Sequence, residues 1–368
     1  MIYRPMGKTG VEISALSMGC GHLPADEAEC DALLRAAVAA GVNYFETAVP
    51  YLDGQCQQKT GHGLEPVRDG IMISAKHGLL VEGEAPGEPA TTGDEYRRQI
   101  LDHQFPALRT DHVEWLQVGW FQAYKLDALR QKGGVLEAIR QMQDEKLVGN
   151  LGCTTHDTPE NTVKIIESGV FESVTLQYNL LNRAYEPALD AAGEHGVAIV
   201  VMGPLHGGML GRPEPALREL VPNPDITTTR AGLQFVLSHP AVSTACSGMS
   251  SLAQLAENVA SATATPTAAD RAEMESIFAR FGEVAASLCT GCNYCAPCPS
   301  GVDISRNLRL RNYLAVYGAI DAAAQAYAEM EPAARAECCT DCGECEEKCP
   351  NQMPVRALLA DIAAACAR

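Results

Sequence analysis

The chain has 368 residues, of which 46% are hydrophobic, and its formal net charge is −18. This length suits one large domain and one small domain, and the acidity argues against nucleic acid and anionic membrane surfaces as partners. No apolar segment reaches the roughly 18–20 residues of a membrane span, and the N-terminus lacks the apolar core of a secretory signal. We therefore expect a cytoplasmic protein that does not bind membranes.

Residues 1–282 alternate short apolar segments with amphipathic helical patterns. The opening IYRPMGKTGVEISAL has apolar–polar alternation on both sides of a KTG turn, which predicts a β-hairpin. Helices are expected at 28–41, 133–146 and 158–169. The eight predicted strands cover residues 14–19, 42–47, 71–76, 113–119, 147–153, 173–179, 198–203 and 242–248.

Eight strands that alternate with helices over about 280 residues predict a (β/α)8 barrel, or TIM barrel. A doubly wound sheet is the alternative, but no G-x-G-x-x-G sequence follows the first strand. The active site of such a barrel lies at the carboxyl ends of its strands. Polar residues at those ends are therefore the candidates for function.

The pattern changes after residue 282. The segment 305–336 is alanine-rich and helical, residues 355–367 predict another helix, and no further strand is predicted. Residues 283–368 are therefore expected to form a second, all-helical, ferredoxin-like domain. A core of this size needs a metal to hold it together.

Eight of the fifteen cysteines lie in two runs within this second domain. The second run, C-x2-C-x2-C-x3-C-P, has the spacing of bacterial [4Fe–4S] ligands, and the first run is one residue shorter before its last cysteine. Two four-cysteine zinc sites are the alternative, but zinc sites tend to take their ligands as two separated pairs. We predict two [4Fe–4S] clusters bound by Cys289, Cys292, Cys295, Cys298, Cys339, Cys342, Cys345 and Cys349.

In this spacing the fourth cysteine usually binds the other cluster. The first three cysteines of each run are then joined by the last cysteine of the other run. Cys349 would complete the first cluster, and Cys298 would complete the second. Cys338 breaks the spacing and is left out, and cysteines outside the runs are expected to be small buried hydrophobic residues.

Three polar residues fall near neighbouring strand ends. Glu46 ends the second predicted strand, Tyr51 follows it, and Lys76 ends the third. A nearby ammonium stabilises a phenolate, so Lys76 is expected to lower the pKa of Tyr51 and let the phenol transfer a proton near neutral pH. Alone, each is an ordinary strand-end residue, but together they predict a catalytic acid–base set in which Glu46 orients Lys76.

The hairpin and the stretches GVNYFETAVPY, ISAK, LGCTTHD, LQYN and SGMSSLAQLAEN resemble the aldo-keto reductase family. The cysteine-rich tail looks like the ferredoxin-type extension found on one branch of that family. The resemblance covers nearly the whole chain. It implies a barrel that binds NADP(H) without a Rossmann domain and transfers a hydride to a carbonyl.

The resemblance implies a catalytic set of Asp, Tyr, Lys and His, which this chain keeps only in part. Tyr51 and Lys76 match, Glu46 replaces the aspartate, and Gly119 stands in the place of the histidine. Three histidines in loops near strand ends are candidates to supply the missing imidazole, namely His22, His77 and His206.

The resemblance also implies the NADP(H) contacts. They comprise nicotinamide contacts at 153–154 and 177, a pyrophosphate loop at 203–207 with a phosphate partner beyond it, and a G-x-S-x3-Q-x2-E-N adenosine segment whose helix N-terminus suits an anion. The implied contacts are Cys153, Thr154, Gln177, Gly203, Pro204, Leu205, His206, Gly207, Arg212, Gly248, Ser250, Gln254, Glu257 and Asn258.

The sequence leaves three functions open. The first is an NADP(H)-dependent oxidoreductase of a small carbonyl-type substrate, whose clusters pass electrons to or from a redox protein such as a ferredoxin or flavoprotein. The second is a ferredoxin-driven reductase that does not use nicotinamide, and the third is a non-catalytic electron-transfer or partner-binding protein. The adenosine segment favours the first, whereas Gly119 favours the other two.

Overall fold

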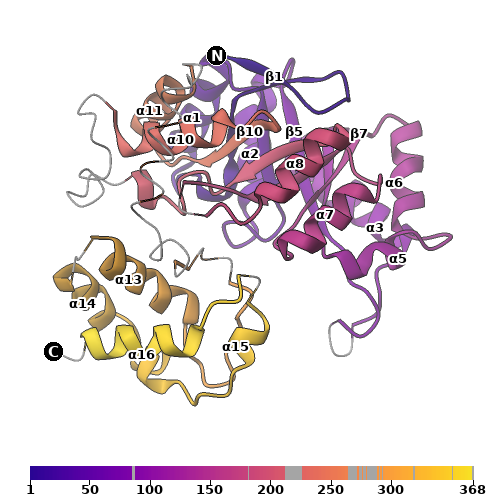
Figure 1. Cartoon of the computed structure of the whole chain (residues 1–368). Helices are drawn as coiled ribbons and strands as arrows, with labels where there is room; N and C mark the ends of the chain where they lie inside the picture. Colours follow the sequence, from indigo (N-terminus) through magenta and orange to yellow (C-terminus); the bar gives the residue numbers. More distant parts are fainter. Residues whose placement is uncertain are drawn as a thin grey trace. The chain divides into compact units, whose positions relative to one another are not determined.

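A computed structural model describes the chain in two compact units (Figure 1). The first unit contains both β-sheets, and the second contains the helices after residue 303 together with a segment that starts at His206. The predicted domain boundary at residue 282 lies outside the described residues. Described are residues 1–84, 88–180, 182–211, 226–263, 272, 276, 279, 288–289, 291, 293–317, 320–349 and 351–366.

The first unit is built on a closed barrel of parallel strands in the order β10-β3-β4-β5-β6-β7-β8-β9. This confirms the predicted (β/α)8 fold class, and each of the predicted strands overlaps one strand of the barrel. The barrel strands are β3 (Leu16–Gly19), β4 (Tyr44–Ala48), β5 (Met72–Gly78), β6 (Val113–Gly119), β7 (Val148–Thr154), β8 (Ser173–Gln177), β9 (Ala198–Met202) and β10 (Val242–Gly248).

The predicted hairpin is also present. Strands β1 (Tyr3–Pro5) and β2 (Glu12–Ser14) pair antiparallel. The fully buried side chains of Met6 and Ile13 belong to the same hydrophobic cluster as Trp115 inside the barrel. The hairpin therefore closes the amino-terminal end of the barrel by burying apolar surface there.

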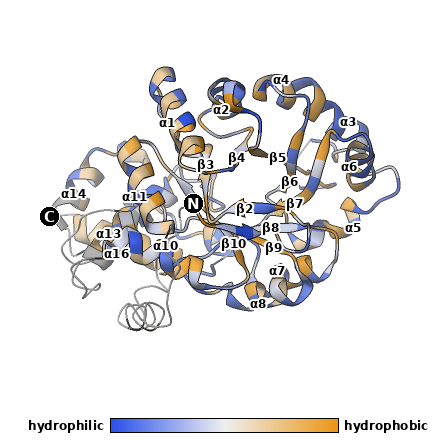
Figure 2. Ribbon diagram, turned by 90° about the horizontal axis from the view of Figure 1, so that it is seen from above, coloured by the Kyte–Doolittle hydropathy of each residue, from blue (hydrophilic) through white to orange (hydrophobic). Residues whose placement is uncertain are grey.

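Helices of the first unit lie around the strands when the barrel is seen from above (Figure 2). In α6, the buried residues Val135, Ala138, Ile139 and Met142 recur at the spacing of one helical face. The helices that follow the strands are α1 (Glu27–Ala39), α2 (Cys56–Leu64), α3 (Gly93–Gln99), α4 (Phe105–Leu108), α5 (Leu126–Leu129), α6 (Val135–Asp144), α7 (Pro159–Glu167), α8 (Glu186–His195), α10 (Thr228–Ser238) and α11 (Leu252–Ala262).

One glutamine links five strands inside the barrel. The Gln117 amide nitrogen on β6 donates to the hydroxyls of Tyr44 (3.3 Å) on β4 and Ser74 (2.6 Å) on β5. Its carbonyl oxygen accepts from the hydroxyls of Thr154 (2.6 Å) on β7 and Thr175 (2.8 Å) on β8. All five side chains are buried. Because alternate residues of a strand face the same side, these contacts identify which residues of each strand face the interior.

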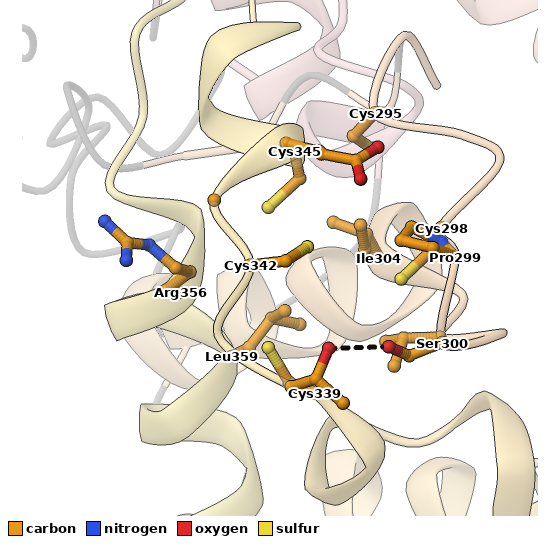
Figure 3. A pocket seen from close by; sticks show the side chains of 14 residues that line it. Cys295, Cys298, Pro299, Ser300, Ile304, Cys339, Cys342, Cys345, Arg356 and Leu359 are labelled. Atoms are coloured by element: carbon orange, nitrogen blue, oxygen red, sulfur yellow. Dashed lines mark hydrogen bonds between the residues drawn. The ribbon is translucent and has the colours of Figure 1, made fainter.

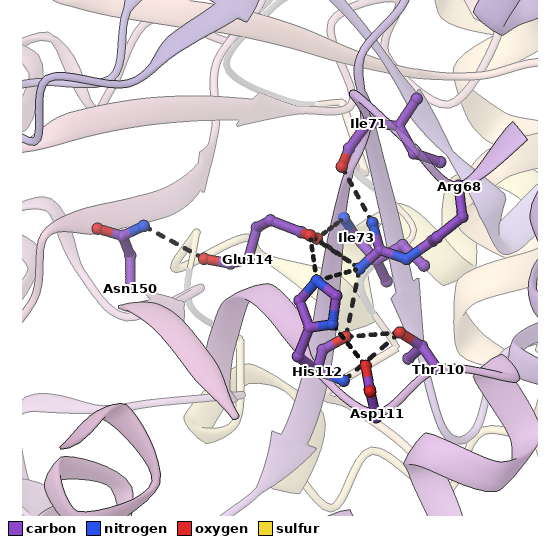
Figure 4. Close-up of polar contacts among 8 residues, drawn as sticks. All are labelled: Arg68, Ile71, Ile73, Thr110, Asp111, His112, Glu114 and Asn150. Atoms are coloured by element: carbon purple, nitrogen blue, oxygen red, sulfur yellow. Dashed lines mark hydrogen bonds and ion pairs between the residues drawn. The ribbon is translucent and has the colours of Figure 1, made fainter. Parts of the chain in front are cut away.

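An ion pair lies at the amino end of β6 (Figure 4). Nη2 of Arg68 donates to both carboxylate oxygens of Glu114, at 2.8 and 3.0 Å. Glu114 also accepts the backbone N–H of Ile73 on β5 at 2.8 Å. The segment before β5 is thereby tied to β6 at the end of the barrel opposite to the predicted site.

The second unit has a hydrophobic core of its own. Buried Leu308 on α13 and Leu359 and Ile362 on α16 belong to this core, and several cysteines of the two runs pack against it. None of the helices among the described residues has the length and apolar composition needed to cross a membrane. Among the described residues after 303, the α-helices are α13 (Ile304–Tyr317), α14 (Ile320–Ala328), α15 (Glu344–Glu347) and α16 (Val355–Cys366).

We predict that Gln117→Leu destabilises the barrel strongly, because it leaves four buried hydroxyls without the partner that they share. The free energy of unfolding should fall by about 3–5 kcal/mol. The measurement is the apparent melting temperature, which should fall with it. Gln131→Leu, at an exposed position, is the control and should melt close to the wild type. Equal melting of the two variants would contradict a structural role for Gln117.

Candidate functional site

The predicted acid–base residues meet at the carboxyl ends of β4 and β5. Lys76 forms an ion pair with Glu46 and donates a hydrogen bond to the hydroxyl of Tyr51. Glu46 and Lys76 are 5% and 3% exposed, whereas Tyr51 is partly exposed. Both charged residues face the interior, since Glu46 is two residues beyond Tyr44 and Lys76 is two beyond Ser74. The structure therefore brings these three residues together.

The electrostatics of Tyr51 differ from the sequence expectation. Burial and the negative charge of Glu46 raise the pKa of Tyr51 to about 12, although Lys76 acts in the opposite direction. The expectation that Lys76 brings the phenol pKa below its usual value is therefore wrong, because desolvation of the phenolate outweighs the ammonium. Burial also disfavours the charged form of Lys76, but Glu46 and Tyr51 outweigh it and raise the pKa of Lys76. Tyr51 thus stays protonated and Lys76 stays charged over the physiological range.

A glycine supports the Tyr51 ring. A Cβ atom on Gly21, in the loop after β3, would lie only 3.1 Å from Cδ2 of Tyr51. That distance is shorter than nine in ten real Cβ contacts, so the ring lies close to the Gly21 backbone. The absence of a side chain at position 21 therefore allows Tyr51 to reach Lys76.

The end of β6 is open where the family resemblance implies a histidine. Gly119 pairs with Gly78 of β5, and a Cβ atom on Gly119 would lie at least 3.5 Å from its neighbours. The next residue, Trp120, has a φ of +52°, which is unusual for a bulky side chain. Its ring lies 3.8 Å from where a Cβ of Gly78 would be. The strand thus ends in a glycine at which a Cβ atom would be tolerated, and an aromatic residue follows it.

The three histidines considered as substitutes lie elsewhere. The His77 ring packs on Tyr96 of α3 and accepts a hydrogen bond from Gln104 at 2.7 Å, so it lies between β5 and the surrounding helices. The His22 ring lies against Gly248. His206 belongs to the second unit and is 4% exposed, and burial lowers its pKa to about 4.

Sequence reasoning missed His156. It lies two residues beyond β7, and burial together with the positive charge of Lys76 lowers its pKa to about 4. The signal was available in the strand pattern. Thr154 faces the interior through its bond to Gln117, and His156 is the second residue after it, beyond the end of β7.

The predicted nicotinamide contacts are all buried. The side-chain amide of Gln177, at the end of β8, lies 3.5 Å from where a Cβ of Gly203 would be. The hydroxyl of Thr154 is already bonded to Gln117, and Cys153 is fully buried. Gln177 and Gly203, two of the predicted nucleotide contacts, therefore lie side by side.

The predicted pyrophosphate loop begins directly after β9. Gly203 and Gly207 have φ values of +61° and +65°, a backbone conformation that favours glycine. The side chain of Asn179 donates to the carbonyl of Gly203 at 3.0 Å. The division between the two units falls in this loop, after Leu205, and Arg212 lies outside the described residues.

The predicted adenosine segment forms the start of α11. The Gln254 side-chain oxygen accepts from the backbone N–H (2.8 Å) and the hydroxyl (3.1 Å) of Ser250. Asn258 is buried and donates to the Ser247 hydroxyl at 2.9 Å, whereas Glu257 is partly exposed. Gln254 and Asn258 therefore stabilise the segment between β10 and α11 through hydrogen bonds within this chain.

Five cysteines of the second unit line a small hollow. Cys298 of the first run lines it together with the first three cysteines of the second run (Figure 3). Cys338 is exposed and donates its thiol hydrogen to the carbonyl of Pro332 at 3.3 Å. Cys292 lies outside the described residues. Within the described ranges, no three Cys, His, Asp or Glu side chains converge as the ligands of a single metal ion would. The cysteines that line the hollow are Cys295, Cys298, Cys339, Cys342 and Cys345.

Comparisons with known families agree with this geometry. Residues 15–279 match the model of the "Aldo/keto reductase family", and residues 288–353 match that of a "4Fe-4S dicluster domain". The sequence resemblance to both is thereby confirmed.

Individual relatives are distant but cover most of the chain. This chain is 23% identical to the uncharacterized oxidoreductase YqkF of Bacillus subtilis, and the match covers 71% of this chain and 91% of that protein. It is 27% identical to L-galactose dehydrogenase of Arabidopsis thaliana (71% and 88% covered) and 25% identical to pyridoxal 4-dehydrogenase of Microbacterium luteolum (70% and 91%). Among solved structures, the aldo-keto reductase AKR11C1 of Bacillus halodurans in its holo form is similar, with a TM-score of 0.66 and 26% identity over 75% of this chain and 96% of that one.

We predict that Tyr51 remains protonated at pH 10.5 in the folded protein, because burial and Glu46 raise its pKa to about 12. The measurement is an NMR titration of the protein labelled at the tyrosine Cζ atoms, with the Tyr51 signal assigned from Tyr51→Phe. In concentrated urea the same residue should titrate near the ordinary value of about 10. Ionisation below pH 10 in the folded state would show instead that Lys76 dominates.

Proposed function

Because the chain belongs to the aldo/keto reductase family and ends in a 4Fe-4S dicluster domain, we propose that it is an NADP(H)-dependent reductase of a small carbonyl compound. The observation that carries this proposal is the contact of Lys76 with both Glu46 and Tyr51 at the carboxyl end of the barrel. Relatives are named as dehydrogenases of pyridoxal and of L-galactose, which supports a small polar substrate.

Proton transfer is the part of the reaction that this site performs. NADPH, when bound, would supply the hydride to the carbonyl carbon. Tyr51 then gives its proton to the carbonyl oxygen, and the products are an alcohol and NADP⁺. Because the Lys76 ammonium donates to the phenol oxygen, the Tyr51 hydrogen is left to point at the substrate. Lys76 stabilises the phenolate that remains, and Glu46 keeps Lys76 charged.

Nucleotide binding is proposed at the loops beyond β8, β9 and β10. The Gln177 amide would bind the nicotinamide carboxamide, and the backbone from Gly203 onward would cover the pyrophosphate. The N-terminus of α11 would face the adenosine phosphates, where free backbone N–H groups suit an anion. The Gln254 bonds to Ser250 hold this loop in shape.

Cluster binding is proposed for the eight cysteines of the two runs. The hollow that Cys298 shares with the first three cysteines of the second run supports the exchange of fourth ligands between the runs. Iron–sulfur clusters pass single electrons, whereas nicotinamide transfers a hydride, so the clusters would exchange electrons with a redox protein such as a ferredoxin or flavoprotein.

A second candidate function is a ferredoxin-driven reduction in the same barrel without nicotinamide. The open position at Gly119 favours it, since the family resemblance implies a histidine there. Anaerobic addition of NADPH, with the nicotinamide and cluster absorbances followed together, separates the two functions.

We predict that NADPH binds the barrel and that Gln254→Ala weakens binding by about tenfold or more, because the Ser250 loop loses its internal support. Isothermal titration calorimetry on the anaerobic holoprotein measures the affinity. Gln325→Ala, on α14 in the second unit, is the control and should bind as the wild type does. Absence of binding by both NADPH and NADH would leave the ferredoxin-driven function as the better candidate.

We predict that Tyr51→Phe lowers kcat for carbonyl reduction by about 10²–10⁴, the usual worth of a general acid. Nucleotide affinity and cluster content should stay nearly unchanged, since only one hydroxyl is removed. Tyr3→Phe removes a hydroxyl that donates to Gly41 and serves as the control, with nearly full activity expected. Full activity of Tyr51→Phe would show that another group supplies the proton.

We predict about eight irons and eight acid-labile sulfides per chain, with a marked loss of iron in Cys298→Ser and none in Cys338→Ser. Cys298 lines the hollow, whereas the Cys338 thiol donates a hydrogen bond to the carbonyl of Pro332. Electron paramagnetic resonance of the reduced variants should show that Cys298→Ser alters the cluster bound by the second run. Stoichiometric zinc without labile sulfide would refute the iron–sulfur assignment.

A further inference from the structure

The glycine at position 119 leaves the substrate oxygen without the imidazole that the family resemblance implies. A group that donates a hydrogen bond there would polarise the carbonyl beside the proton donor Tyr51. Strand β7 is the next strand after β6 in the barrel. A side chain that extends inward from the end of β7 can therefore reach the space beside the end of β6.

We propose that His156 supplies this hydrogen bond, so that the oxygen-binding imidazole has moved from the end of β6 to the end of β7. The proposal rests on the proposed carbonyl reduction and names one further catalytic residue for it. Three observations on the strand ends support it.

The first observation is that the residues of β7 that lead to His156 face the barrel interior. Gly152 faces the interior, since a Cβ there would meet the hydroxyl of Ser173 and the ring of Trp115. Thr154 also faces the interior, because its hydroxyl bonds to Gln117. His156 follows Thr155, whose backbone N–H still donates to the Thr175 carbonyl of β8 at 3.0 Å, so the pairing reaches the residue before His156.

The second observation is position. The backbone N–H of Phe121 donates to the carbonyl of Thr154 at 2.8 Å, so the chain beyond Gly119 runs beside the chain that leads into His156. The charge of Lys76 acts on the imidazole, which places His156 within electrostatic reach of the acid–base residues. Its side chain is partly exposed, so a ligand can contact it.

The third observation is rigidity. The residue after His156 is held from both sides, because the Asp157 carboxylate accepts the backbone N–H groups of Ala123 and Thr158, each at 2.8 Å. The Tyr185 hydroxyl donates to the Asp157 carbonyl at 2.6 Å. A donor that is fixed before the substrate arrives stabilises developing charge more effectively than one that must reorganise.

The protonation state suits a donor that does not itself transfer the proton. Burial and Lys76 keep the pKa of His156 near 4, so the imidazole is neutral at physiological pH. A neutral imidazole still has one N–H to donate. The division of tasks would be that His156 polarises the oxygen and Tyr51 protonates it.

The test measures kcat/KM for reduction of 4-nitrobenzaldehyde by NADPH with the full-length anaerobic protein. We expect His156→Ala to lower kcat/KM by about 10²-fold, the cost of losing one oxygen-binding donor, with NADPH affinity and melting temperature nearly unchanged. Adding Gly119→His to that variant should restore about tenfold, because a Cβ atom at position 119 would meet its neighbours only at ordinary contact distances. His195→Ala, at an exposed position on α8, should match the wild type. A fall of about twofold or less in His156→Ala would overturn the proposal.

A second measurement separates this proposal from the proposed function. In protein labelled with ¹⁵N-histidine, the His156 resonances are those absent from His156→Ala. Saturating 4-nitrobenzaldehyde should move them even where no turnover occurs. A wild type that oxidises no NADPH but shows this movement would refute the proposed reaction and support the role of His156, whereas unmoved resonances would overturn the role.

Discussion

The barrel interior depends on the amide of Gln117. An amide has two donors and two acceptor positions, and each is matched to a hydroxyl from a different strand. The network joins β6 to β4, β5, β7 and β8, and these strands carry Glu46, Lys76 and Gln177 one layer above it. Because a fully satisfied buried network specifies one arrangement of the strands, the geometry of the candidate site follows from this glutamine.

The same burial that orders the site decides its acid–base character. A buried ammonium is tolerated only with a charged partner and further hydrogen bonds, and Glu46 and Tyr51 provide them for Lys76. The carboxylate that stabilises Lys76 also disfavours the phenolate. The site is therefore arranged to keep a phenol protonated beside a permanent cation, which suits donation of a proton more than its removal.

The barrel forms with a glycine at position 119, where the family resemblance implies a histidine. A missing side chain at Gly119 leaves the strand pairing intact, because the pairing uses backbone groups. Neighbouring strand ends converge on the same opening, so a group from β7 can serve a position that β6 has vacated. The second unit matches a 4Fe-4S dicluster domain, and its hollow is lined by cysteines that come from two segments of the chain.

The sequence by itself determined the barrel, the hairpin, the helical tail and the acid–base residues. Strand periodicity and cysteine spacing are local properties, and Glu46, Tyr51 and Lys76 could be grouped because parallel strands present their carboxyl ends together. Only the tertiary structure decided the direction of the Tyr51 pKa shift, since desolvation depends on every side chain packed around the phenol. It alone showed that the charge of Lys76 reaches His156, whereas the cysteine spacing had already predicted Cys298 beside the second run. Lys76 and His156 are far apart in the sequence, and only chain folding sets the distance between them.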